Sequence, residues 1–148
     1  MHLKSFVSAL ILFVSLCLPA SAQTYDLNNF LGTYVSNSSP DYVGVKRLTI
    51  TKEATGKLKV RATISAFPDD VYLGEATAEP YTCRPTEAYR SLLSTFSAGK
   101  LSVLMVVVNI PGAPEDVITT TYVKYTDSSK PNAYFESRLQ KEPEKPAK

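Results

Sequence analysis

The side chains that most often carry catalysis are almost missing from this sequence. It holds one histidine, His2, and two cysteines, Cys17 and Cys83. His2 and Cys17 lie in a leader that we expect to be removed, and the rest of the chain then has no imidazole for a catalytic triad or a metal site. Cys83 stands next to Arg84, whose charge favours a reactive thiolate, but a lone packed cysteine is the simpler interpretation. These residue types favour a protein that is not an enzyme and needs no cofactor.

Pairs of carboxylates are the next candidates for chemistry. Glu75 and Glu79 fall on one face of a predicted strand, about 13 Å apart at the usual rise per residue, which is too far for a retaining pair of carboxylates. The pairs Asp69-Asp70 and Glu115-Asp116 offer oxygens to calcium, but neither has the spacing of a known calcium loop. Turn residues explain both pairs, so we predict no metal site.

Tyrosine is the side chain that best suggests binding, because it combines an apolar ring with a polar tip. The sequence has nine tyrosines. Four are expected on strands and are our candidate ligand-binding residues: Tyr34, Tyr72, Tyr122 and Tyr125. Small inward residues could leave a narrow cavity beside them: Ala62, Ala66, Ala76 and Ala78. The alternative is that the tyrosines reflect β-propensity and that larger side chains fill the space.

Residues 1–22 carry the pattern of a secretory signal peptide. His2 and Lys4 form a positive end, residues 6–18 are an apolar run, and Ala20-Ser21-Ala22 is a cleavage site before Gln23. The apolar run is short for a membrane-spanning helix. We therefore expect export to the periplasm or the medium, with no stable membrane insertion. The net charge of +2, without a basic cluster, gives no reason to expect nucleic acid.

The remaining chain is typical of short strands separated by turns. Lys57–Phe67 alternates apolar and polar residues, which predicts one packed face and one wet face. The expected strands are Phe30–Val35, Val43–Thr51, Lys57–Phe67, Val71–Pro80, a segment ending near Gly99, Leu101–Ile110, Asp116–Thr126 and Ala133–Gln140. Residues 86–96 also fit a helical spacing, and we favour a strand because every neighbour is one.

No long helical crossover separates these strands, so the sheet should be antiparallel. About eight antiparallel strands in one all-β domain predict an up-and-down β-barrel, which removes exposed edges; a two-sheet β-sandwich is the alternative. We place the barrel domain at residues 23–140 and a disordered charged tail at residues 141–148.

Leu101–Ile110 is apolar on both of its faces, which predicts a strand buried on both sides. A barrel strand needs only one apolar face. The second face therefore predicts a homo-oligomer or protein-partner interface, for which we name Leu104, Val106 and Val108.

Gly32-Thr33-Tyr34 resembles the Gly-x-Trp start of lipocalin-type and avidin-type barrels, with Tyr in place of Trp. The resemblance implies a structural role for Gly32 and an arginine late in the chain that packs on the ring, for which Arg138 is the candidate. The order GTY, KRLTI, LKVRA, DDVYLGEATAEPY and YVKYTDSSKPNAY is also similar to small exported bacterial proteins of unassigned function. Those proteins carry a cysteine pair and a Trp in a middle segment, and residues 66–73 lack both. Over Phe30–Gln140 the resemblance implies a calycin-type barrel rather than an activity.

Together these observations favour an exported, non-enzymatic β-barrel that binds a small apolar or amphipathic ligand in its open end. The alternative is a protein-binding module, such as an inhibitor or an envelope-assembly partner, that acts through loops or an outer apolar face.

Overall fold

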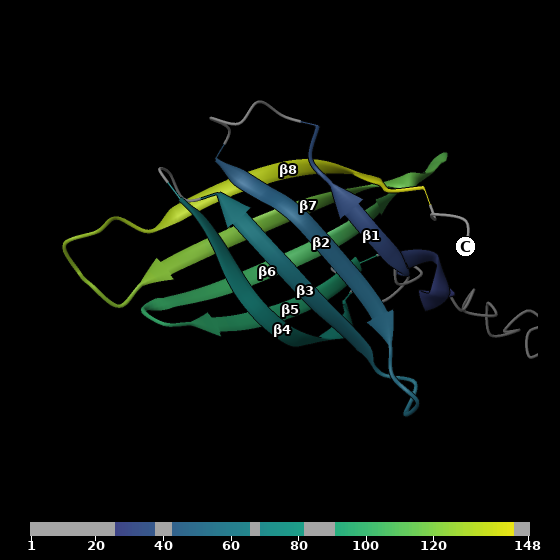
Figure 1. Cartoon of the computed structure of the whole chain (residues 1–148), viewed down its shortest axis with the longest axis horizontal. Helices are drawn as coiled ribbons and strands as arrows, with labels where there is room; N and C mark the ends of the chain where they lie inside the picture. The colour runs from purple at the N-terminus through teal and green to yellow at the C-terminus, as the bar shows by residue number, and fades with distance from the viewer. Residues whose placement is uncertain (1–25, 38–42, 66–68, 82–90, 144–148) are drawn as a thin grey trace, which may run out of the picture.

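The computed structural model describes residues 26–37, 43–65, 69–81 and 91–143. In chain order its elements are η1 (Leu27–Phe30), β1 (Gly32–Val35), β2 (Gly44–Lys52), β3 (Leu58–Ser65), β4 (Asp70–Tyr81), β5 (Ser91–Ala98), β6 (Leu101–Ile110), β7 (Ala113–Tyr125) and β8 (Ala133–Lys141). Each strand pairs antiparallel with its neighbours in the sequence, and β8 returns to β1 to close the barrel (Figure 1). The predicted up-and-down β-barrel is confirmed, and the sandwich is not formed.

The start of the barrel differs from our prediction at two residues, Phe30 and Leu31, which precede the first strand. Phe30 does not begin the first strand but ends η1, a short 3₁₀ helix. The carboxylate of Asp26 caps this helix by accepting the backbone N–H of Asn28 at 2.9 Å. The barrel therefore starts at Gly32, and Phe30 is fully buried against its end.

The end of the barrel also lies slightly further along the chain than predicted. β8 includes Lys141, and the backbone N–H of Glu142 donates to the Thr33 carbonyl at 2.7 Å. The carboxylate of Glu142 pairs with Arg47 at 2.6 Å. The first two residues of the predicted tail thus belong to the barrel. Residues 144–148 and residues 1–25 lie outside the described residues.

The fifth strand settles part of the uncertain segment. Ser91–Ala98 is a strand paired with β6 over its whole length, as favoured from its neighbours. Residues 86–90 of the predicted segment lie outside the described residues.

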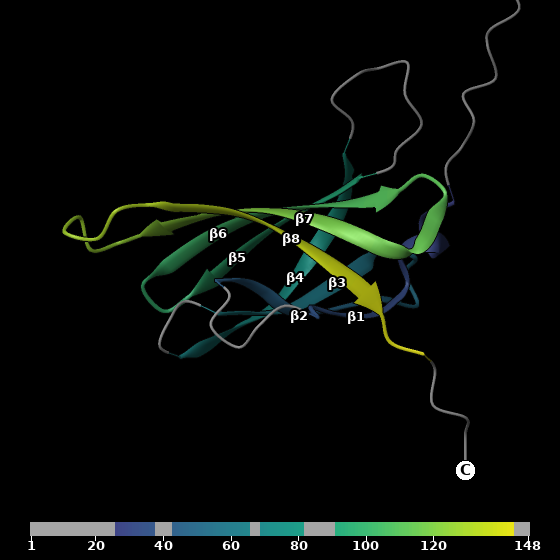
Figure 2. The ribbon, with the colours of Figure 1, turned by 90° about the horizontal axis from the view of Figure 1, so that it is seen from above.

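The barrel is made of two four-stranded halves, β1–β4 and β5–β8. Within them most ladders have eight to ten residue pairs. Among the described residues the ladders that join the halves are short: β4 and β5 share four pairs, as β1 and β2 do, and β1 and β8 share two. Figure 2 shows β6–β8 along one side of the molecule and β1–β3 along the other. Beyond the end of β1, the Val45 N–H of β2 donates to the Ser137 hydroxyl of β8 at 2.9 Å, so a side chain joins the halves there.

Alternation along each strand sends one set of side chains into the barrel. Side chains that expose 2% or less of their surface include Tyr34, Leu48, Ile50, Leu58, Val60, Leu92, Phe96, Val103, Met105, Val107, Val117 and Leu139. They fill the middle of the barrel with the barrel's own side chains, as is usual for a barrel of eight strands. A ligand site must therefore lie at an end or on the outside.

Candidate functional site

A shallow cavity of about 360 Å³, widely open to solvent, lies at the end of the barrel that η1 approaches. It is bounded by η1, by the turn between β2 and β3, and by the end of β4. Its lining residues are Leu27, Thr55, Gly56, Lys57, Leu58, Thr77, Ala78, Glu79 and Pro80.

The base of this cavity is built from two inward residues of neighbouring strands. Leu58 of β3 and Ala78 of β4 are in register and are 2% and 5% exposed. Ala78 is one of the small inward residues noted in the sequence, and a larger side chain there would extend into the cavity. Leu27 of η1, half-buried against the core, adds an apolar wall. The base of the cavity is therefore apolar.

The rim of the cavity is polar because polar residues of the tight turn between β2 and β3 form part of it. In this turn the Glu53 N–H donates to the Lys57 carbonyl and the Gly56 N–H donates to the Glu53 carbonyl, both at 2.9 Å. Gly56 has φ +83°, a conformation that side chains with a Cβ rarely adopt. The turn places Thr55 and Lys57 on the rim, which also includes Glu79 of β4. The rim thus offers a hydroxyl, an ammonium and a carboxylate.

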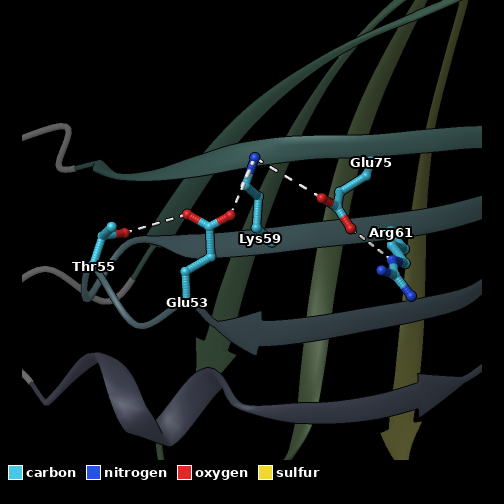
Figure 3. A network of polar contacts seen from close by, with 5 residues as sticks. All are labelled: Glu53, Thr55, Lys59, Arg61 and Glu75. Carbon is cyan, nitrogen blue, oxygen red and sulfur yellow. Dashed lines mark hydrogen bonds and ion pairs between the residues drawn. The ribbon is translucent and has the colours of Figure 1, made fainter.

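A chain of polar contacts holds this turn against the outside of β3 and β4 (Figure 3). The Thr55 hydroxyl donates to Glu53 at 3.3 Å, and the Lys59 ammonium lies 3.6 Å from Glu53 and 3.9 Å from Glu75. Arg61 Nε donates to Glu75 at 2.7 Å. This hydrogen bond and the negative charge of Glu75 raise the pKa of Arg61 above its usual value. Glu75 thus forms ion pairs with two basic side chains of β3 on the outside of the barrel.

The four candidate tyrosines do not come together. Tyr34 is inside the barrel, where its hydroxyl donates to the Phe30 carbonyl at 3.0 Å and so holds the end of η1. Tyr72 and Tyr122 lie on the outer surface, 60% and 41% exposed. Tyr125 is half-buried at the end of the barrel opposite η1. None of the four lines the cavity. The cavity is formed by η1 and the β2–β3 turn, and the positions of the tyrosines in the sequence do not predict where these two elements lie.

The environment of Tyr125 is formed by the loop between β7 and β8. The Lys130 ammonium lies 5.6 Å from the centre of its ring, within the range of a cation–π contact. In the same loop, the hydroxyl and the backbone N–H of Ser129 donate to Asp127 at 2.6 and 3.0 Å. These two hydrogen bonds hold the pKa of Asp127 below its usual value. The loop is therefore ordered by its own polar groups.

The predicted contact between Arg138 and Tyr34 is wrong. Tyr34 points into the barrel, and the β8 residue opposite it is Lys141. Arg138 points outward, and its Nε and Nη2 donate to Asp116 of β7 at 3.0 and 2.5 Å. Because Tyr34 faces the inside of the barrel and Arg138 the outside, the two side chains lie on opposite sides of the sheet and cannot stack. Arg138 instead links β7 and β8.

Gly32, for which the resemblance implied a structural role, opens the first strand. Its φ is +142°, and a Cβ there would lie 2.6 Å from Cε of Lys141. The backbone conformation favours glycine, whereas the flexible end of the lysine side chain can move away from an added Cβ.

Within the single chain β6 is fully buried on its inner face only, and the cover that we predict for its outer face would have to come from another molecule. Val103, Met105 and Val107 point inward and are fully buried, whereas Leu104 is 43% exposed and Val106 and Val108 are half-buried on the outside. Outward residues of β5 and β7 stand beside them in register. The resulting array carries no charge, and we call it the uncharged face: Ser91, Leu93, Thr95, Leu104, Val106, Val108, Ile118, Thr120 and Tyr122. Of its larger members, Leu93 and Ile118 were not identified from the sequence, because register between strands was not known.

Comparisons with known proteins do not indicate a function for this chain. No family model, no curated protein and no solved structure significantly matches this chain. In the part of the chain that the structure describes, no helix has the length and apolar composition needed to cross a bilayer. Within the same residues, no group of three or more His, Cys, Asp or Glu side chains could hold a metal ion. The closed eight-stranded antiparallel barrel is consistent with a calycin-type fold.

Proposed function

We propose that this protein is an exported, non-enzymatic β-barrel that binds a small amphipathic molecule in the cavity beside η1. The observation that carries the proposal is the cavity itself, with an apolar base at Leu58 and Ala78 and a polar rim at Thr55, Lys57 and Glu79. The pattern of residues 1–22 supports export. The order of motifs supports a relation to small exported bacterial proteins.

The shape of the cavity limits the ligand. Since the middle of the barrel is filled, the apolar part of the ligand rests against the end of the core and does not extend along the barrel axis. Its polar part meets both a positive and a negative side chain at the rim, Lys57 and Glu79. A compact apolar group with one polar or zwitterionic end fits this arrangement better than a long acyl chain.

Filling the cavity tests the proposal. Anilinonaphthalene sulfonate, a small amphipathic fluorescent probe, should bind the wild-type protein, and Ala78→Leu should weaken binding at least tenfold, which is more than 1.4 kcal/mol. Ala98→Leu is the matched control, because Ala98 is a half-buried alanine at the opposite end of the barrel. Val106→Asp reports any probe that binds the uncharged face instead.

Equal affinities for wild type and Ala78→Leu would contradict the cavity as the site, as would an equal loss in Ala98→Leu. If Ala78→Leu does not fold, Lys57→Gln and Glu79→Gln test the exposed rim without changing the core. Unchanged binding in both rim variants would also contradict the proposal.

A protein-binding role through the outside of the barrel is the second candidate. Exposed Leu104 and Tyr122 within the uncharged face support it.

A further inference from the structure

On β6, the strip of outward aliphatic residues is arranged symmetrically about one line across the strands, whereas the β5 and β7 residues beside it are not matched across that line. Along β6 its outward residues run Leu104, Val106, Val108 and, at the strand end, Ile110. A line between Val106 and Val108 leaves one valine and one larger aliphatic side chain on each side. The strip can therefore meet a second copy of itself, reversed in direction, with like sizes of side chain in contact.

On β8, beside the strip, one acidic and one basic residue lie on opposite sides of the same line. Val106 is paired with Thr120 of β7, which is paired with Glu136 of β8. In the same way, Val108 is paired with Ile118, which is paired with Arg138. A two-fold axis along the line would set Glu136 of one copy against Arg138 of the other, twice. Arg138 can take part while bound to Asp116, because its side chain is 65% exposed.

The opposite edge of the face is compatible with the same axis. There β4 places Glu79 in register with Leu93 and Tyr81 in register with Ser91. The axis therefore sets Glu79 against a tyrosine, and no like charges meet at either edge.

We propose that two copies of this chain form a homodimer through their uncharged faces around this two-fold axis. An isologous interface needs a patch that is complementary to itself, and both the aliphatic strip and the Glu136–Arg138 pair meet that condition. A different protein partner would require neither. Glu79 lies both on the rim of the cavity and at the edge of the dimer face, but no other residue is shared, and failure of the dimer would leave the cavity proposal untouched.

Sedimentation velocity over a range of concentrations tests the dimer directly. The wild-type protein should sediment as a dimer at high micromolar concentration, and Tyr122→Asp should shift the equilibrium at least tenfold towards monomer. Tyr72→Asp is the matched control, because Tyr72 also points outward from a strand but lies on the other half of the barrel, 60% exposed. Val106→Asp should act like Tyr122→Asp, and circular dichroism should show that each variant is folded.

Charge reversal tests the axis itself. Glu136→Arg should weaken the dimer at least tenfold at low ionic strength, because it sets two arginines against each other. The effect should shrink at about 1 M salt, where the screening length falls to about 3 Å. A monomeric wild type, a wild type that binds only another polypeptide, or equal effects of Tyr122→Asp and Tyr72→Asp would overturn the dimer. A dimer that does not respond to Glu136→Arg would overturn the axis.

Discussion

The outer faces of β3 and β6 belong to the same barrel and yet present opposite surfaces. Outward from β3 stand Lys59 and Arg61, tied to Glu75 on β4. Outward from β6 stand Leu104, Val106 and Val108, with no charged residue beside them on β5 or β7 within the uncharged face. Inside the barrel the two strands are alike, since both contribute buried aliphatic side chains.

This contrast shows that the fold constrains the inward residues of a strand more strongly than its outward residues. Closing and filling a barrel fixes the inward residues, and both halves satisfy that requirement. The outward residues are free to keep the protein soluble, as on β3, or to provide a surface for contact, as we infer on β6.

The largest effect should come from two neighbouring residues of β6. Val107→Asp places an unpaired charge in the core, at a cost of several kcal/mol. That cost approaches the whole stability of a typical domain, about 5–15 kcal/mol, so the variant should be unfolded. Val106→Asp lies on the outside and should leave the barrel folded. Thermal unfolding followed by circular dichroism distinguishes the two, and equal effects would contradict the assignment of faces.

A smaller effect is expected where the two halves meet. Ser137→Ala removes the acceptor of the Val45 N–H, which is fully buried. A buried donor left without a partner costs about 1–3 kcal/mol, and urea denaturation should show a loss of that size. Ser102→Ala is the control, because Ser102 is exposed on β6 and should change stability little. A loss in Ser137→Ala no larger than in Ser102→Ala would show that this bond does not hold the seam.

The smallest effect is expected on the charged side of the comparison. Glu75→Gln removes the partner of Lys59 and Arg61, and exposed ion pairs contribute about 0.2–1 kcal/mol. The loss should disappear at about 1 M salt because of screening. Leu104→Gln, on the uncharged face, should show no comparable salt dependence in monomeric conditions. A loss in Glu75→Gln that persists in high salt would mean that packing, not charge, holds Glu75.

The inside of the barrel could be predicted from the sequence wherever one face of a strand was clearly polar. Alternation in Lys57–Phe67 identified Leu58, Val60, Ala62 and Ile64 as inward, and all four are buried. On Leu101–Ile110 both faces are apolar, so alternation could not choose between them. The choice depends on which side of the whole sheet closes around the core, and alternation along a single strand does not report that.

The cavity and the failed Arg138 contact show what alternation along one strand cannot supply. The cavity needs the position of η1 relative to the β2–β3 turn, which is a three-dimensional relation. The contact needed the relative parity of β1 and β8, which a bulge or a one-residue change in register reverses. Bulges occur in three of the ladders, for example where β6 meets β7 at Asn109 and Ile110.

The short ladder between β1 and β8 has a consequence for how the chain folds. Every other ladder joins strands that are adjacent in the sequence, so it can form by local hairpin closure. The ladder of Tyr34 and Val35 with Lys141 and Gln140 joins the two ends of the domain and has only two residue pairs. Because contacts between distant residues form slowly, we expect this closure to be a late step in folding. Until then β1 and β8 are both free edges, and the nearly complete sheet is exposed to pairing with another unfinished chain.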